Sequence, residues 1–134
     1  MSDQIGRGRA TYLYRMYDQA GALLYAGITT SVKRRLEEHR PKCWYREVAR
    51  IETDEYPTRW RAALAECTSG HGRYGTLPGG IGKGLAASMS EMELAEAAAH
   101  PVYANLSDGS LARQWGISVQ KIRELRRTAP PSAR

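Results

Sequence analysis

The chain lacks phenylalanine, has only two cysteines among its 134 residues, and contains no long apolar run. Cys43 and Cys67 match neither a metal-binding spacing nor a disulfide framework, so we expect two reduced, unpaired thiols, as in a cytoplasmic protein. No window approaches 18 consecutive apolar residues, and the first nine residues lack the apolar stretch of a signal peptide. These absences predict no membrane partner, whereas the missing phenylalanine carries no functional information.

Acidic residues are also in deficit. The chain has 20 Lys and Arg against 14 Asp and Glu, which gives a net charge of +6 and an isoelectric point near 9.6. A basic balance favours polyanionic partners but does not choose among them. The length suits one small domain with an appendage.

The N-terminal third contains a β-hairpin pattern. Two runs rich in aromatic and aliphatic residues, 12–17 and 22–28, flank the polar turn Asp18-Gln19-Ala20-Gly21. The period of two in a strand places Tyr12, Tyr14 and Met16 on one face. The hairpin therefore predicts the first two strands of a sheet.

A basic helix is predicted directly after the hairpin. Ser31 is placed as the N-cap of a helix over residues 32–39. Arg35 and His39 are four residues apart, so they share one face of this helix. Taken alone, they would form a solvated basic face, and the hairpin tyrosines would be half-buried strand residues.

This hairpin and helix resemble the GIY-YIG nuclease family, which is named for two short motifs on such a hairpin. Tyr14 corresponds to the tyrosine of the first motif, and Tyr25-Ala26-Gly27 is the second motif with Ala in the middle. Arg35 corresponds to the family's arginine, and His39 to a histidine found in a restriction-enzyme subset. The chain departs from the pattern at Tyr12, which stands where the first motif has glycine.

The resemblance implies a catalytic role for each of these residues. Tyr14 would act as general base or position the attacking water, and Tyr25 would hold that water or a phosphate oxygen. Arg35 would stabilise the charge that develops on the phosphate, and His39 would assist proton transfer. The implied activity is phosphodiester hydrolysis of double-stranded DNA.

A third strand and a second helix complete the expected fold. Residues 48–53 alternate as in a strand, and Thr58 is placed as the N-cap of a helix that continues to Glu66. Three strands and helices in this order predict a small α/β domain with a mostly antiparallel three-stranded sheet flanked by helices.

The family uses one glutamate for a divalent cation, Mg²⁺ or Mn²⁺, and here three candidates compete. Glu66 is favoured because a strand, a proline and a helix precede it, while Glu96 and Glu93 on a later predicted helix are the alternatives. Asn105 would orient the site, because Pro101-Val102-Tyr103-Ala104-Asn105 resembles the family's Pro-x-Tyr-Asn ending. The remaining alternative is that all three glutamates are solvated helix carboxylates and that the nuclease has lost its metal.

A glycine-rich stretch at about residues 68–87 separates these landmarks. We expect a mobile surface insertion, whose His71, Arg73 and Lys83 are available for a backbone phosphate. A phosphate-binding P-loop is excluded because Lys83 is followed by glycine rather than Ser or Thr.

Residues 107–128 resemble a helix-turn-helix, with Gly116 at the turn and Ser118 as the cap of the second helix. From Ser107 onward six Lys and Arg face two Asp and Glu, a charge suited to phosphate contact. The alternative is an amphipathic hairpin that packs on the first domain or pairs between chains in a homodimer. The residues predicted to bind DNA are Lys33, Arg34, Gln120, Lys121, Arg123 and Arg127.

The expected organisation is a nuclease domain over residues 1–106, the DNA-binding segment 107–128, and a disordered tail 129–134. The favoured function is a metal-dependent endonuclease of small homing, phage or restriction-like type. The alternative is a non-catalytic DNA-binding regulator on a degenerate nuclease scaffold. A third hypothesis, an RNA-directed nuclease or toxin, stays open because phosphate contacts do not distinguish DNA from RNA.

Overall fold

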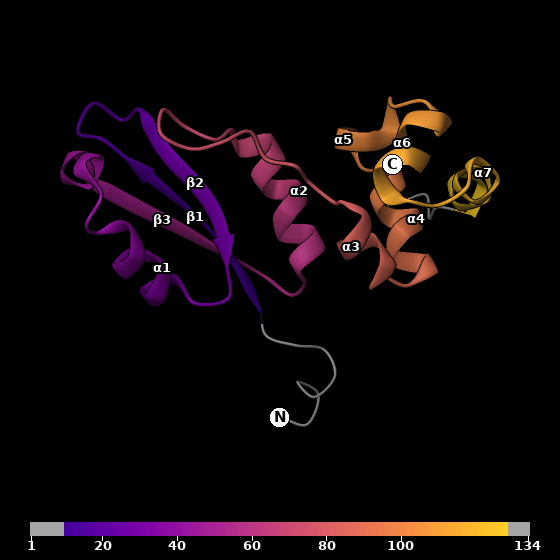
Figure 1. Cartoon of the computed structure of the whole chain (residues 1–134), viewed down its shortest axis with the longest axis horizontal. Coiled ribbons are helices and arrows are strands. Elements are labelled where there is room, and N and C mark those ends of the chain that lie inside the picture. Colours follow the sequence, from indigo (N-terminus) through magenta and orange to yellow (C-terminus); the bar gives the residue numbers. More distant parts are fainter. Residues whose placement is uncertain (1–9, 129–134) are drawn as a thin grey trace, which may run out of the picture. The chain divides into compact units, whose positions relative to one another are not determined.

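The computed structural model describes residues 10–128 and divides the chain into two compact units, Met1–Gly80 and Ile81–Arg134 (Figure 1). The sequence predicts the boundary after residue 106. The helices before that point instead pack with the two helices after it, because two helices alone cannot bury a core. The predicted tail 129–134 lies outside the described residues.

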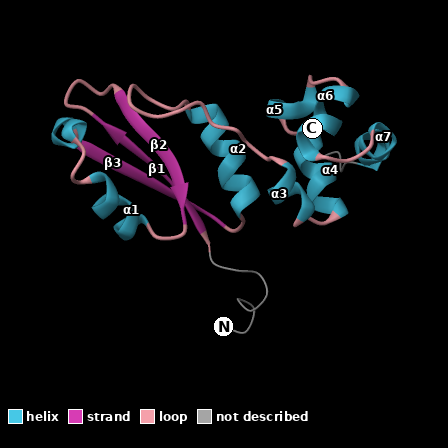
Figure 2. Ribbon diagram, viewed as in Figure 1, coloured by secondary structure: helices cyan, strands magenta, loops and turns pink. Residues whose placement is uncertain are grey.

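The first unit is built on a three-stranded sheet, which confirms the predicted fold class (Figure 2). The strand order is β2-β1-β3, and both neighbouring pairs are antiparallel. Helices α1 and α2 and a short 3₁₀ helix, η2, complete the unit. Its elements are β1 (Thr11–Tyr17), β2 (Leu23–Thr29), α1 (Val32–His39), η2 (Cys43–Glu47), β3 (Arg50–Tyr56) and α2 (Arg59–Ser69).

The turn between β1 and β2 has the residues that the sequence predicted. The Gly21 amide donates to the carbonyl oxygen of Asp18 at 3.0 Å. The amide of Ala22 donates to a carboxylate oxygen of Asp18 at 2.9 Å. The local side chain thus satisfies a backbone donor where the chain reverses, which is why aspartate is favoured in turns.

The central strand β1 is buried on both faces. Leu13 and Tyr14 are consecutive, so they point to opposite faces of the sheet, and both are 0% exposed. Helix α2 contacts all three strands and buries Trp60 and Leu64. Burial of both faces fixes the register of β1, since a slip of one residue would exchange the two sets of side chains.

The third strand begins later than predicted, at Arg50 rather than Val48. Val48 instead follows η2, and its amide donates to the carbonyl oxygen of Tyr45 at 3.0 Å. This 3₁₀ turn, which the sequence did not reveal, uses the backbone donor that a strand would need. Both cysteines are free thiols, as predicted.

The second unit is helical and has a core of its own. Helix α7 contacts α4 and α6, and α6 contacts α3. Trp115, Leu111 and Ile122 are at most 2% exposed, and they provide much of the apolar interior. Among the described residues, no helix has the length and apolarity to cross a membrane. The elements are α3 (Lys83–Ala87), α4 (Glu91–Ala99), α5 (Pro101–Ala104), α6 (Asp108–Trp115) and α7 (Val119–Thr128).

Candidate functional site

A buried hydrogen bond joins β1 to α1 at the centre of the first unit. The hydroxyl oxygen of Tyr14 lies 2.7 Å from Nε2 of His39, and both residues are 0% exposed. The strand places Tyr14, and the last turn of α1 returns His39 to it across 25 positions of sequence. His39 is therefore not part of a solvated basic face, as it would be if α1 were only a surface helix.

Burial keeps both partners of this hydrogen bond uncharged. It lowers the pKa of His39 to about 4, helped by the positive charges of Lys42 and Arg35. Burial also raises the pKa of Tyr14 well above its usual value, and the neighbouring Tyr25 adds to this effect. Within the described residues, Nδ1 of His39 has no hydrogen-bond partner. At neutral pH the hydrogen bond therefore joins a neutral phenol to a neutral imidazole.

Arg35 lies one helical turn before His39, beside the second tyrosine. Its Nη2 donates to the hydroxyl of Tyr25 at 3.5 Å, and its Nη1 pairs with Glu38 at 2.5 Å. Glu38 is also the main cause of the raised pKa of Arg35. Arg35 and Tyr25 are both half-buried, so the guanidinium and the hydroxyl are within reach of a ligand. Sequence reasoning missed Glu38, although it is three residues from Arg35 on the same helix face.

Gly27 leaves the space that the two tyrosines occupy. It pairs with Tyr14 across the β1–β2 ladder. A Cβ atom at position 27 would lie 2.8 Å from the Tyr14 hydroxyl oxygen and 3.1 Å from Cε1 of Tyr25. Any larger residue would therefore push the hydroxyl group away from His39, so steric contact explains why glycine occupies position 27.

Four aromatic rings lie in series from the buried tyrosine to the surface, and we call this series the aromatic ladder. The ring centroids of Tyr14 and Tyr25 are 5.9 Å apart, and those of Tyr25 and Trp44 are 5.6 Å apart. Trp44 and Tyr74 follow at 5.4 Å with an interplanar angle of 7°. Such spacings are typical of offset stacking. Trp44 and Tyr74 are 30 positions apart in the sequence, so residue spacing gives no sign that their rings stack.

The start of the glycine-rich stretch is attached to the sheet rather than being a free loop. The backbone amides of Arg73 and Tyr74 donate to the carbonyl oxygens of Leu23 and Leu24 at 3.2 and 2.8 Å. These bonds hold the stretch along the outer edge of β2. We had expected a mobile insertion here; the open edge of a sheet instead offers backbone partners that composition does not reveal. Farther along, residues 83–87 form helix α3.

The candidate metal ligands are distributed over both units. Glu66 is half-buried on α2, in the same unit as the tyrosines, and burial raises its pKa. Glu93 caps its own helix, because its carboxylate accepts from the Ser90 amide at 2.9 Å. Glu96 and Asn105 also belong to the second unit, on α4 and at the end of α5. Within residues 10–128, no three His, Cys, Asp or Glu side chains gather as a metal-binding group.

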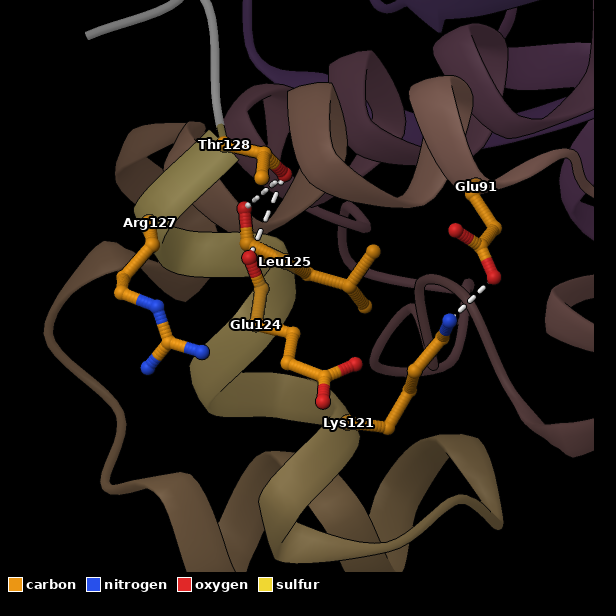
Figure 3. A pocket seen from close by; sticks show the side chains of 6 residues that line it. All are labelled: Glu91, Lys121, Glu124, Leu125, Arg127 and Thr128. Atoms are coloured by element: carbon orange, nitrogen blue, oxygen red, sulfur yellow. Dashed lines mark hydrogen bonds and ion pairs between the residues drawn. The ribbon is translucent and has the colours of Figure 1, made fainter.

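The residues predicted to bind DNA differ in their exposure to solvent. Gln120, Arg123 and Arg127 are exposed on α7, as are Lys33 and Arg34 on α1. Lys121 is instead half-buried and forms an ion pair with Glu91 of α4 (Figure 3). Its side chain lines a pocket of about 340 Å³, whose other lining residues include Glu124 and Arg127. Lys121 therefore joins two helices, which was not expected.

The turn between α6 and α7 has the geometry of a tight helix–helix connection. Gly116 adopts the left-handed conformation at φ 72°, and its amide donates to the carbonyl oxygen of Ala112 at 2.8 Å. Glycine adopts this conformation without steric cost. The Lys121 amide donates to the side-chain oxygen of Ser118 at 3.0 Å, so Ser118 caps α7 as predicted.

Comparison with known proteins gives a family match for most of the described part of the first unit. Residues 10–68 match the family described as GIY-YIG catalytic domain, which confirms the resemblance over this segment. The matched segment contains the hairpin, α1, β3 and nearly all of α2, and thus every residue of the tyrosine–histidine–arginine site. Neither a curated protein nor a solved structure matches the chain.

Proposed function

We propose, from the premise that residues 10–68 match the GIY-YIG catalytic domain, that this chain is a metal-dependent DNA endonuclease. The observation that carries the proposal is the convergence of Tyr14, Tyr25, Arg35 and His39 from β1, β2 and α1. A guanidinium for phosphate and a neutral pair for proton transfer are what phosphodiester hydrolysis requires.

Arg35 is the residue that binds the scissile phosphate. Its guanidinium is held between Tyr25 and Glu38, and its side chain is 32% exposed. A phosphate oxygen would take the place of the Glu38 carboxylate and form a charge-assisted hydrogen bond with Arg35. The bond strengthens as negative charge develops on the phosphate, so Arg35 lowers the energy of the transition state.

Tyr14 and His39 provide the path for the proton of the attacking water. Tyr14 takes one proton from the water while its own hydroxyl proton passes to Nε2 of His39, 2.7 Å away. The imidazole of His39 is neutral at pH 7, because burial lowers its pKa, so the lone pair of Nε2 is free for this proton. Tyr25, which is half-buried, holds the water on the side that the substrate enters.

Glu66 is the residue that would hold Mg²⁺ or Mn²⁺. Its half-buried carboxylate has a raised pKa because burial disfavours the charge, and a bound cation would relieve that cost. A single carboxylate fits magnesium, which usually keeps several waters and is completed by substrate phosphate. When bound, the cation would neutralise charge on the scissile phosphate.

The second unit would supply affinity for double-stranded DNA through α7. Gln120, Arg123 and Arg127 are exposed at spacings of three and four residues, so they form one stripe on the helix. Such a stripe suits the major groove, with arginine at base edges or phosphates. This arrangement supports a small homing, phage or restriction-like cutter with a helix-turn-helix reader, acting as a monomer or a homodimer.

The test is nicking of supercoiled plasmid with and without Mg²⁺. Arg35→Ala should slow nicking by about 10²- to 10³-fold, the usual cost of one transition-state donor. Arg40→Ala is the matched control, because it removes an exposed positive charge at the end of the same helix. DNA binding without Mg²⁺-dependent nicking, or equal rates for the two variants, would contradict the proposal and favour a non-catalytic DNA-binding protein.

A further inference from the structure

The outer end of the aromatic ladder is exposed to solvent, whereas its inner end is buried. Tyr14 at the inner end is 0% exposed, whereas Tyr74 at the outer end is 38% exposed. Trp44, between Tyr25 and Tyr74, is half-buried. The four rings thus connect the proton-transfer pair to a flat aromatic surface that solvent reaches.

The outer ring is held in a fixed position. The Tyr74 amide is bound to the carbonyl of Leu24 at 2.8 Å, and the Tyr74 hydroxyl donates to Glu47 at 2.7 Å. Two anchors at opposite ends of one residue reduce the entropy lost when a ligand stacks on its ring. A tyrosine placed there only to cover Trp44 would not need its hydroxyl tied to η2.

One cation lies near each of these two rings. The Arg73 guanidinium lies 5.9 Å from the Tyr74 ring centre, and the Lys42 ammonium lies 6.0 Å from that of Trp44. Arg73 also pairs with Glu47 at 3.4 Å, so one carboxylate partly balances this charge. An exposed aromatic ring with cations close by is the combination that binds single-stranded nucleic acid, where bases stack and the backbone follows the cations.

We propose that the ring of Tyr74, backed on one face by Trp44, forms a stacking platform for an unpaired base of the DNA substrate. The inference rests on the proposed nuclease function, because the ladder leads to Tyr25 and through it to Arg35. Paired bases are already stacked in a duplex, so the platform selects DNA with an extrahelical base, a flap or a single strand. Stacking tolerates every base, so it selects structure rather than sequence.

The experiment measures binding without cleavage. Duplex oligonucleotides with one 2-aminopurine, either bulged out or paired, are titrated with the full chain in EDTA. Stacking on an aromatic ring should quench the bulged fluorophore but not the paired one. Tyr74→Ala should abolish the quenching and weaken binding of the bulged duplex by about 5-fold or more. Tyr74→Phe, which keeps the ring and loses the Glu47 hydrogen bond, should keep most of both.

Leu77→Ala is the matched control, since Leu77 is 80% exposed on the same segment but has no ring. If Tyr74→Ala does not fold, Tyr74→Leu is used instead to test the platform, because it keeps an apolar side chain but has no ring. Equal affinity and quenching for Tyr74→Leu and the wild type would overturn the platform, and so would equal losses in Tyr74→Phe and Tyr74→Ala. Because EDTA prevents cleavage, failure of the platform is distinct from failure of the nuclease proposal, which plasmid nicking tests separately.

Discussion

The candidate functional side chains of the two units differ in their exposure. In the first, Tyr14 and His39 are hydrogen-bonded to each other in the interior, 25 residues apart in sequence. In the second, Arg123 and Arg127 are exposed on a surface helix, and ion pairs such as Arg123 with Asp108 lie at the surface. Burial changes protonation, whereas exposure keeps charge available. This difference is the basis for proposing chemistry in the first unit and DNA binding in the second.

The largest effect should come from the buried pair. Tyr14→Phe removes the hydroxyl and keeps the ring, so the proton path to His39 is lost and nicking should fall by about 10²- to 10⁴-fold. Unfolding free energy should also fall by about 1–3 kcal/mol, because Nε2 of His39 is left unpaired. Tyr12→Phe, on the same strand but half-buried, is the control for both measurements. Full nicking activity in Tyr14→Phe would contradict a catalytic role for the Tyr14–His39 pair.

The second largest effect is expected from the metal ligand, because the candidate glutamates lie in different units. Glu66→Gln should reduce Mg²⁺-dependent nicking by at least about 10²-fold while DNA affinity stays nearly unchanged. Its melting temperature at pH 7 should be equal or higher, because burial raises the pKa of Glu66 and so disfavours the charged form. Glu93→Gln and Glu96→Gln, assayed in parallel, should nick normally. A loss in either of them instead would assign the cation to the second unit.

Stability should depend on pH through His39. Its folded pKa of about 4 lies below the ordinary 6.5, so the unfolded chain binds more protons between these values. The unfolding free energy should therefore decrease as pH falls from about 6.5 to about 4, by on the order of 3 kcal/mol. Urea unfolding of wild type and His39→Gln across this range checks it. Identical pH dependences would show that His39 is solvated.

The smallest effects are expected from two adjacent arginines of the second unit. Arg127 is exposed, so Arg127→Ala should weaken binding to all duplexes and reduce the salt slope by about one, without lowering the melting temperature. Arg126 donates to Asp108 at 2.6 Å and to the Tyr103 carbonyl at 2.9 Å. Arg126→Ala should instead cost about 1–2 kcal/mol of stability. The same loss of stability in both variants would mean that α7 offers no free charge.

The local sequence was sufficient to predict the elements that carry the site. The hairpin turn and the Ser31 and Thr58 caps are all as predicted. Each depends on residues within three or four positions of one another, so spacing alone identifies them. The spacing of the tyrosines and Arg35 also indicated the GIY-YIG family, whose catalytic-domain model matches residues 10–68.

Tertiary structure decided what distant residues do to one another. Only the packing of α1 on the sheet buries His39 against Tyr14, and only the edge of β2 brings Tyr74 to Trp44. The unit boundary likewise lies at Gly80, because α3 to α5 are needed to complete the core around α6 and α7. Burial, stacking and shared cores depend on distance in space, which residue spacing along the chain does not specify.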